Sequence, residues 1–418
     1  MAGRRTFIKT AALAVPGLAV LGASKPQWVP SSSLPDEEYW DEIRQLYALP
    51  DSRTYLNTGG LGPSPTPVLD RYNTLTAELQ GISETGHHFI EEARAPVSQF
   101  FGADETEISF TRNATEGNAT IASGLRLSVG DEIIIDAHAH PGGAIPWLNL
   151  LKERGVVVKL FEPDAPTQDE VIQRIVDQMT PRTRVIQISH VTAPTGILLP
   201  AREIALLARE WGCWFHIDGA QSAGMLPINL HDIGCDSYAT SGHKWLGAPH
   251  GTGILYISKD RLDDVFPTEV GAYSDASYTL PDQLEYIATS RRHESGTRNA
   301  PLVEGIRTAC AFMGDIGMER VRERGLELTE LLRLGLEEIE SIEVLSPVRR
   351  ELRGSILTFK SSRIDYASLN RTLGSIHKLR LRVVTERELN AIRVSLHVFN
   401  SPAEVARIVE SVSEALKM

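Results

Sequence analysis

Short apolar runs alternate with amphipathic segments along the first two-thirds of the chain. Five of the apolar runs predict β-strands, at residues 107–111, 131–137, 156–161, 183–191 and 213–220. Four segments between them carry apolar residues at helical spacing, at residues 114–125, 143–155, 169–179 and 200–212. This order predicts an α/β fold in which helices cover both faces of a mostly parallel sheet. Ligands of such sheets bind beyond the carboxyl ends of the strands, so we expect the chemistry there.

The pattern changes near residue 317. A long amphipathic segment at 318–339 predicts a helix, and later apolar runs predict strands at 355–360, 379–384 and 391–399. A final helix is predicted over 401–417, because Ser401 and Glu404 form a capping-box pattern. Pro402 stands at its first helical position, where a proline is well tolerated. These elements indicate a second, smaller α+β domain.

The pattern divides the chain into four segments. They are an N-terminal segment (1–30), an arm with Gly/Pro turns (31–66), a large domain (67–316) and the small α+β domain (317–418). In the first segment, Arg4 and Arg5 precede an apolar run from Ala11 to Ala23, which is short for a membrane span. This arrangement is similar to a twin-arginine signal peptide. We therefore expect a periplasmic or extracytoplasmic protein without a stable membrane anchor; a chance arginine pair is the alternative.

Composition excludes some classes of function. The net charge is −12 and the sequence pI about 5.5, which disfavours a nucleic-acid binder. The cysteines at 213, 235 and 310 have no metal-binding or redox spacing. His138 and His140 are two residues apart, so on a strand both would point to the same face and could bind a metal together. No acidic or cysteine cluster completes such a site. We therefore expect no metal.

Two charged residues follow apolar runs that read as strands. Asp218 stands at the end of the apolar part of the run at 213–220, and Lys244 ends the stretch at 235–244. A buried carboxylate is costly unless a cation or a strong donor meets it. Pyridoxal 5′-phosphate (PLP) requires both a lysine for its Schiff base and an acid beside its ring nitrogen. These two residues alone leave a second explanation open, which is an ion pair that joins two loops.

The continuous stretch from His216 to Ile257 resembles the class V aminotransferases of the fold-type I PLP superfamily, which includes cysteine desulfurases and isopenicillin N epimerase-like proteins. The resemblance extends from about Tyr55 to the C-terminus. It implies PLP as the cofactor and a seven-stranded, mostly parallel sheet in the large domain. By this resemblance Lys244 forms the Schiff base, Asp218 pairs with the ring nitrogen, and Gln221 contacts the phenolate oxygen.

The resemblance also assigns the remaining site residues. His140 would stack on the cofactor ring. The phosphate would be bound by Thr115, Glu116, Ser241 and His243, and by Thr297 of a neighbouring subunit, which implies a homodimer with a shared active site. A helix start near Thr115 favours an anion independently of the resemblance, although simple N-capping would use the same donors. Arg393 would bind the substrate carboxylate, and Asn57 would line the same pocket.

Three departures from the family pattern bear on the reaction. Ala193 stands where desulfurases carry an asparagine, and Thr192 or Thr195 is expected to compensate. Arg298 replaces a proline. The segment before the Arg393 strand contains no cysteine, and persulfide chemistry needs a thiolate there.

We therefore expect Lys244 to act at Cα of an amino acid, as in an aminotransferase or an epimerase. A C–S lyase that eliminates without a catalytic cysteine is the alternative. A sugar aminotransferase and a PLP-carrying binding protein are further possibilities.

Overall fold

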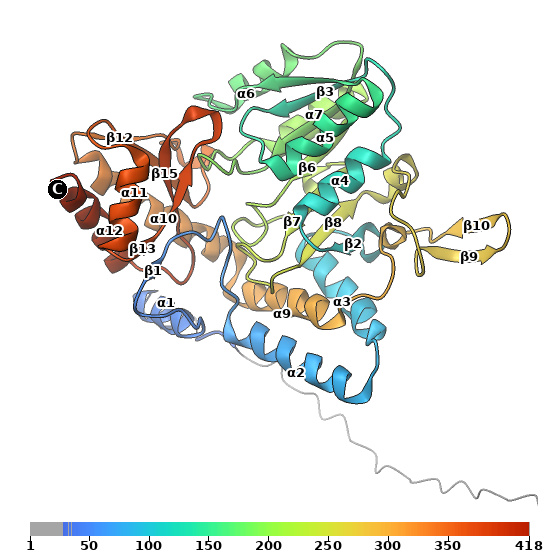
Figure 1. Cartoon of the computed structure of the whole chain (residues 1–418), viewed down its shortest axis with the longest axis horizontal. Coiled ribbons are helices and arrows are strands. Elements are labelled where there is room, and N and C mark those ends of the chain that lie inside the picture. Colours follow the sequence, from blue (N-terminus) through green and yellow to red (C-terminus); the bar gives the residue numbers. More distant parts are fainter. Residues whose placement is uncertain (1–27, 32, 35, 418) are drawn as a thin grey trace, which may run out of the picture.

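The computed structural model describes residues 28–31, 33–34 and 36–417, so the expected export signal lies outside the described residues. Its centre is a seven-stranded sheet (Figure 1). The strands, in spatial order, are β2 (Ile108–Thr111), β8 (Gly253–Ile257), β7 (Ser237–Ser241), β6 (Trp214–Asp218), β5 (Thr183–Ser189), β3 (Glu132–Asp136) and β4 (Val157–Phe161). Only β8 runs antiparallel to its neighbours in this sheet. The predicted α/β class and the mostly parallel sheet are confirmed.

Helices cover both faces of this sheet because its central strands are apolar on both sides. On one face, α4 (Ala114–Gly124) and α5 (Pro141–Arg154) pack with Ile133, Ile135 and Trp214. The alternate residues of the same strands, among them Ile134 and Phe215, belong to the core of the other face. The helices of that core include α1 (Asp36–Gln45), α2 (Thr66–Ile82), α3 (His87–Phe100), α6 (Gln168–Val176), α7 (Ala201–Trp211), α8 (Leu230–Ile233) and α9 (Ala300–Ile316).

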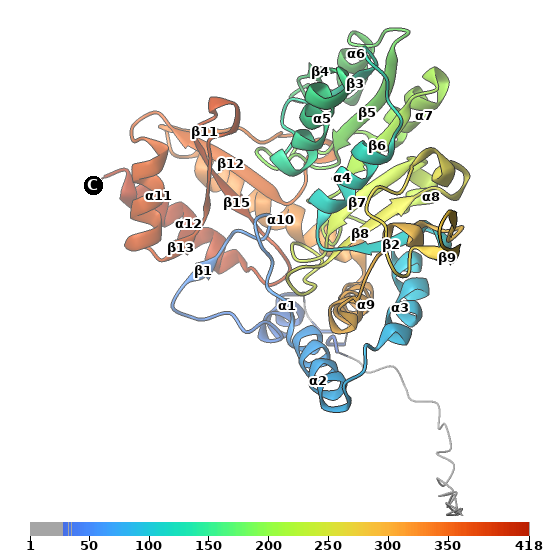
Figure 2. The same ribbon diagram turned by 45° about the vertical axis from the view of Figure 1, so that its right-hand side comes forward.

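The C-terminal part has a separate core around an antiparallel four-stranded sheet. Its strands, in spatial order, are β11 (Ile342–Val344), β12 (Ile356–Ser361), β15 (Ala391–Ser395) and β14 (Arg382–Val384). Its helices are α10 (Met318–Glu337), α11 (Tyr366–Ser375) and α12 (Pro402–Ala415). The capping box at Ser401 and Glu404 is formed as the sequence predicts. Figure 2 shows this part beside the larger sheet.

The segment 379–384 differs from the single strand that its apolar pattern predicts. β13 (Leu379–Arg380) pairs in parallel with β1 (Thr54–Tyr55) of the N-terminal arm, whereas β14 joins β15. The chain changes partners at Leu381, whose side chain is buried in the C-terminal core. The arm is thus tied to the C-terminal part, while the predicted domain limits stay predictions.

The structure adds elements that the sequence pattern did not reveal. Helix α1 (Asp36–Gln45) lies within the arm, and β9 (Asp275–Thr279) and β10 (Gln283–Tyr286) form a hairpin that projects from the body (Figure 1). Short 3₁₀ turns lie at Glu105–Glu107, Lys259–Asp264, Ser290–His293, Arg350–Leu352 and Glu386–Glu388. Among the described residues, no helix combines the length and the apolar character that a membrane crossing needs.

Candidate active site

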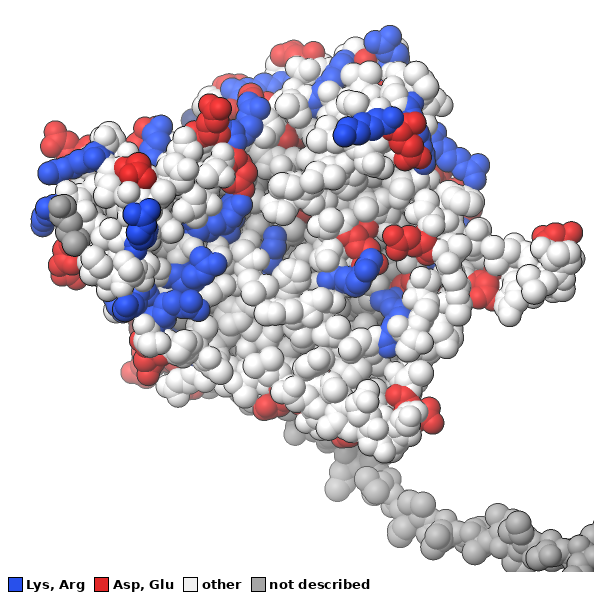
Figure 3. All heavy atoms as spheres, in the orientation of Figure 1, with Lys and Arg blue, Asp and Glu red and all other residues white. Residues whose placement is uncertain are grey.

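A cavity of about 290 Å³ lies at the carboxyl ends of the central strands, between the large sheet and the C-terminal part. Figure 3 shows this face hollowed there, with basic side chains around the hollow. Eight of the predicted residues line the cavity: Thr115, His140, Asp218, Gln221, Ser241, His243, Lys244 and Arg393. Residues that are far apart in the sequence therefore meet where parallel-sheet proteins bind ligands.

Lys244 lies in the turn that follows β7 and is half-buried. Burial lowers the pKa of this amine to about 8, although the charge of Asp218 opposes the shift. The arm lies directly against this turn, because the Gly62 N–H donates to the His243 carbonyl at 2.8 Å. A Cβ at Gly62 would stand 1.8 Å from the Lys244 carbonyl oxygen, so only glycine permits this approach. The arrangement provides an amine that gives up its proton more readily than a free lysine does.

Asp218 ends β6 with its carboxylate buried, and each of its oxygens accepts a hydrogen bond. Its Oδ1 accepts from the Ala220 N–H at 3.0 Å, and its Oδ2 accepts from Nδ2 of Asn118 at 3.1 Å. These two hydrogen bonds fix the orientation of the carboxylate. Asn118 was missed in the sequence. The one sequence feature that could have indicated this role is the position of an asparagine in the middle of the short helix α4, because such residues favour helix ends and turns.

The orientation of the Gln221 amide follows from its neighbours. The Trp245 indole N–H, which can only donate, bonds to Gln221 Oε1 at 2.7 Å. Gln221 Nε2 therefore points to the Gly59 carbonyl at 2.9 Å. An amide nitrogen carries two hydrogens, so one remains to donate to an oxygen in the cavity.

His140 lines the cavity as the N-cap of α5. Its Nδ1 accepts from the Gly142 N–H at 3.1 Å, and burial, then the nearby Lys244, lowers the pKa of the ring. The neutral ring presents a flat aromatic surface to the cavity. His138 instead forms a hydrogen bond through Nδ1 with Thr195 Oγ1 at 3.1 Å. The two histidines therefore bond to different parts of the chain and do not face a common ligand through Nδ1.

The start of α4 forms a corner that suits an anion. Ser241 Oγ accepts from the Ala114 N–H at 2.9 Å, which leaves its own hydrogen to donate. Thr115 lies in the first turn, whose N–H groups have no intrahelical partners. A Cβ at Gly142 would stand 2.4 Å from Thr115 Oγ1, so a glycine keeps the corner open. Burial lowers the pKa of His243 to about 4, and its Nδ1 has no partner among the described residues. These groups fit a phosphate.

Arg393 lies on β15 with only 1% of its surface exposed. Its Nη1 donates to the Ala193 carbonyl at 2.8 Å, and its Nη2 donates to Asn57 Oδ1 at 3.0 Å. No carboxylate of the described residues forms an ion pair with it, and Nε has no partner. Burial, then the nearby Arg382, lowers the pKa of Arg393 to about 9. A buried cation without a counter-ion is costly, which indicates an anionic ligand in this cavity.

Several predicted residues do not line the cavity. Asn57 acts through Arg393, as described. Thr192 Oγ1 instead bonds to Thr195 Oγ1 at 2.9 Å and accepts from the Ile197 N–H at 2.9 Å, which closes a turn. Neither threonine therefore takes the place that Ala193 occupies in the cavity wall. Arg382 lines the cavity although the sequence did not single it out, because β14 places it directly across from Arg393.

Glu116 and Thr297 line a second, neighbouring cavity of about 370 Å³. The Glu116 carboxylate accepts from the Arg112 N–H at 2.5 Å and from Arg112 Nε at 3.1 Å. Its own N–H donates to Asn113 Oδ1 at 3.0 Å, so neither group is available to the anion corner. A carboxylate would also repel a phosphate. The expected role of Glu116 therefore has no support in this geometry.

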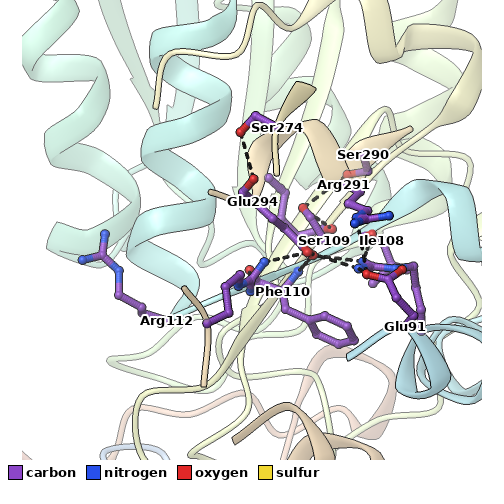
Figure 4. A network of polar contacts seen from close by, with 12 residues as sticks. Glu91, Ile108, Ser109, Phe110, Arg112, Ser274, Ser290, Arg291 and Glu294 are labelled. Atoms are coloured by element: carbon purple, nitrogen blue, oxygen red, sulfur yellow. Dashed lines mark hydrogen bonds and ion pairs between the residues drawn. The ribbon is translucent and has the colours of Figure 1, made fainter. Parts of the chain in front are cut away.

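The loop that carries Thr297 is fixed by Glu294 (Figure 4). Glu294 Oε1 accepts from Arg94 Nη1 at 2.9 Å and from the Phe110 N–H at 2.7 Å, and Arg298 lies 2.6 Å from Oε2. The charges of Arg298 and Arg94 outweigh the effect of burial and lower the pKa of Glu294. The network ties this loop to β2 through the Phe110 N–H, and Thr297 lines the second cavity, not the cavity that contains Lys244 of the same chain.

Comparison with known proteins agrees with this geometry. The family model for aminotransferase class-V matches residues 65–408. Isopenicillin N epimerase of Amycolatopsis lactamdurans is 30% identical over 90% of this chain and 99% of its own length. A probable cysteine desulfurase of Methanothermobacter thermautotrophicus is 27% identical over 90% of this chain and 98% of its own.

Two solved structures of C-DES also match. One is a lysine-to-alanine mutant with glycine covalently linked to the PLP cofactor; it has a TM-score of 0.80 and 25% identity, and covers 89% of this chain and 99% of its own. The other, a complex of this cystine C–S lyase with its product cysteine persulfide, has a TM-score of 0.81 and 26% identity, over 87% and 98%. With the matched family model, these findings show that the chain belongs to the aminotransferase class-V family of PLP-dependent, fold-type I enzymes.

Proposed function

We propose that this enzyme acts on a substrate with an α-amino acid head and removes the proton from its Cα. The observation that carries this proposal is that Lys244 and Arg393 line the same cavity. Lys244 offers an amine with a lowered pKa, and Arg393 offers a buried guanidinium without a counter-ion. Bound PLP supplies an electron sink for the negative charge that develops at Cα.

The residues divide the work by position. Arg393 would bind the substrate carboxylate with its forked donors and so hold Cα near Lys244. Lys244 Nζ would then take the Cα proton as a general base. Aminotransfer or epimerisation would follow, according to where a proton returns.

The other residues would hold the cofactor. Asp218 would accept a hydrogen bond from the ring nitrogen, and Gln221 Nε2 would donate to the phenolate oxygen. His140 would lie against the ring. Thr115, Ser241 and His243 would bind the phosphate at the start of α4.

A panel of amino acids tests this proposal. We expect the visible absorption band of the PLP-loaded protein to shift or bleach with some of the common L-amino acids or their D enantiomers. Amines that lack a carboxylate should have no such effect at the same concentration. A band that responds to no amino acid, or that responds to a keto sugar with an amine donor, would contradict the proposal.

The rival reaction is desulfuration or β-elimination at a C–S bond, which the similarity to C-DES and to cysteine desulfurases favours. Desulfuration through a cysteine nucleophile has little support, because Cys213, Cys235 and Cys310 are all buried. Burial raises the pKa of Cys213 to about 11, and it raises the pKa of the other two thiols further. None of the three lines the cavity.

We predict that iodoacetamide leaves the activity of the native protein within about twofold, because a buried thiol with a raised pKa provides almost no thiolate. The measurement compares alkylation, by mass spectrometry, with the residual activity. In denaturant the same reagent should modify the thiols, which is the control. Activity that falls in proportion to thiol modification would restore the desulfurase hypothesis. Pyruvate and persulfide from cystine without any alkylation-sensitive step would favour the C–S lyase.

We also propose a homodimer with a shared active site. Thr297 lies away from Lys244 of its own chain, on a loop that Glu294 fixes, and the projecting hairpin exposes Tyr278, Leu280 and Leu284. Figure 3 shows the hairpin as a largely uncharged projection. Mixing Lys244→Ala chains with Thr297→Asp chains should restore activity, because one site of the mixed dimer has both residues intact. A monomeric mass in sedimentation would exclude this arrangement.

The proposal for location rests on the twin arginines alone. Export to the periplasm or another extracytoplasmic space should fail when Arg4 and Arg5 are both replaced by lysine. A mature protein found only in the cytosol with an intact N-terminus would contradict export.

A further inference from the structure

A chain of buried polar side chains leads from Asp218, through Asn118 of the cavity wall, into the protein interior. Trp214, His216 and Asp218 alternate along β6, so all three point to the face that α4 covers. Ser237 lies opposite His216 on β7, and Asn118 reaches the same place from α4. All five side chains are buried, and His216, Ser237 and Asn118 have no exposed surface.

The distances connect these side chains into one series. Trp214 Nε1 lies 2.9 Å from Ser237 Oγ, which lies 2.8 Å from His216 Nδ1. His216 Nε2 lies 2.9 Å from Asn118 Oδ1, and Asn118 Nδ2 lies 3.1 Å from Asp218 Oδ2.

The direction of every hydrogen bond in the series can be worked out. One end of the Asn118 amide faces two acceptors, Asp218 Oδ2 and the Gly142 carbonyl at 3.2 Å. That end must therefore be the nitrogen, Nδ2, and the other end the oxygen. The oxygen then accepts from His216, which must carry its proton on Nε2. Burial lowers the pKa of His216 to about 3, so the ring is neutral and Nδ1 is an acceptor.

The remaining two bonds follow from this tautomer. Only the Ser237 hydroxyl can donate to His216 Nδ1, and the Trp214 indole N–H, which is a donor only, points to Ser237 Oγ. Every donor therefore points toward Asp218, from Trp214 through Ser237, His216 and Asn118. We call these four residues the donor relay.

We propose that the donor relay positions Asp218 and keeps it ionised, so that a proton shared with the cofactor's ring nitrogen stays on the nitrogen. A proton on Asp218 Oδ2 would face the Asn118 N–H. Reversing that contact would require the Asn118 amide to flip, the His216 proton to move to Nδ1 and the Ser237 hydroxyl to turn away, and it would set the Asn118 oxygen against the Gly142 carbonyl. Because the relay bonds polarise one another, its effect at Asp218 exceeds that of one neutral hydrogen bond. The inference rests on the proposed role of Asp218 at the ring nitrogen.

The first test is the ¹⁵N chemical shift of the ring nitrogen in protein loaded with ¹⁵N-labelled PLP, without substrate. The wild type should give the shift of a protonated ring. Asn118→Asp places a second carboxylate beside Asp218, so the two would compete for the proton and the signal should move toward the unprotonated value. The dissociation constant for PLP should rise about tenfold or more, as is common when an outer partner of a ligand residue is lost.

Further variants separate positioning from packing. His216→Phe removes the donor to Asn118 and should change both readouts in the same direction, while His216→Gln, which can donate from its amide, should recover part of the change. Ser237→Ala acts at the far end and should give a smaller effect in a variant that folds readily. His190→Phe is the matched control, because His190 is also buried beside the Asp218 backbone but its ring bonds to no described residue.

The proposal would be overturned if Asn118→Asp and Ser237→Ala both kept the ¹⁵N shift and the PLP dissociation constant of the wild type. Equal changes in His190→Phe and His216→Phe would also overturn it, since they would indicate packing alone. These readouts need no substrate, so they stand apart from the test of Cα chemistry. If the ¹⁵N shift showed a protonated ring but no amino acid changed the absorption band, the proposal for the relay would stand and only the proposed function would be contradicted.

Discussion

Replacing Lys244 by alanine is expected to remove the visible absorption band of the PLP-loaded protein and to lower activity at least about 10³-fold. General base catalysis alone contributes about 10²- to 10⁴-fold, and this variant also loses the covalent attachment of the cofactor. The fold should survive, because the side chain is only half-buried and forms no hydrogen bond to another described residue. Spectrophotometry and steady-state kinetics measure both effects.

Lys259→Ala is the matched control for this prediction. Lys259 is an exposed lysine paired with Asp104 at 2.8 Å, outside the cavity, and its loss should leave both readouts unchanged. Added methylamine should restore part of the activity of Lys244→Ala, since a small amine can enter the vacated space. Activity within tenfold of the wild type in Lys244→Ala would contradict the role assigned to this residue.

Replacing Arg393 by alanine is expected to raise the KM for amino-acid substrates about 100-fold or more. Truncating one partner of a buried, hydrogen-bonded charge pair costs about 2–5 kcal/mol, and the bound carboxylate would lose its forked donor. Arg393→Lys keeps a charge but not the fork, so it should recover affinity only in part. The measurement is the concentration dependence of the initial rate and of the absorbance change.

Two controls accompany this second prediction. An amine that lacks the carboxylate should bind wild type and Arg393→Ala equally weakly. Thermal unfolding should show little loss of stability, because removing a buried cation without a counter-ion offsets the lost bonds to Ala193 and Asn57. An unchanged KM in Arg393→Ala would indicate a substrate without a carboxylate, such as an amino sugar.

Much of the fold could be predicted because its signals are local and repetitive. Buried parallel strands alternate with amphipathic helices, and each strand from β2 to β6 coincides with an apolar run. The capping box of α12 was equally readable. The hairpin of β9 and β10 was not, because its strands are short and their residues are largely exposed. The split at Leu381 depends on a distant partner, Thr54–Tyr55, which no local pattern reveals.

The sequence alone indicated those site residues that come directly after a predicted strand. Asp218 and Lys244 stand at such ends, and the resemblance to a family supplied Arg393. What a neighbouring element supplies could not be predicted. Asn118 bonds to Asp218 only because α4 covers that face of β6, and Arg382 joins the cavity only through its register with Arg393. Glu116 lies at the start of a helix, but its contacts with Arg112 could not be predicted from the sequence.

The measurement that tests the central claim most directly is exchange of the Cα proton of amino acids in D₂O, followed by NMR with the PLP-loaded protein. The panel comprises the common L-amino acids and their D enantiomers. We predict that at least one of them loses its Cα–H signal with wild type and Lys259→Ala, while it keeps the signal with Lys244→Ala. A full set of retained Cα–H signals with the wild-type protein, or equal exchange without Lys244, would contradict the account.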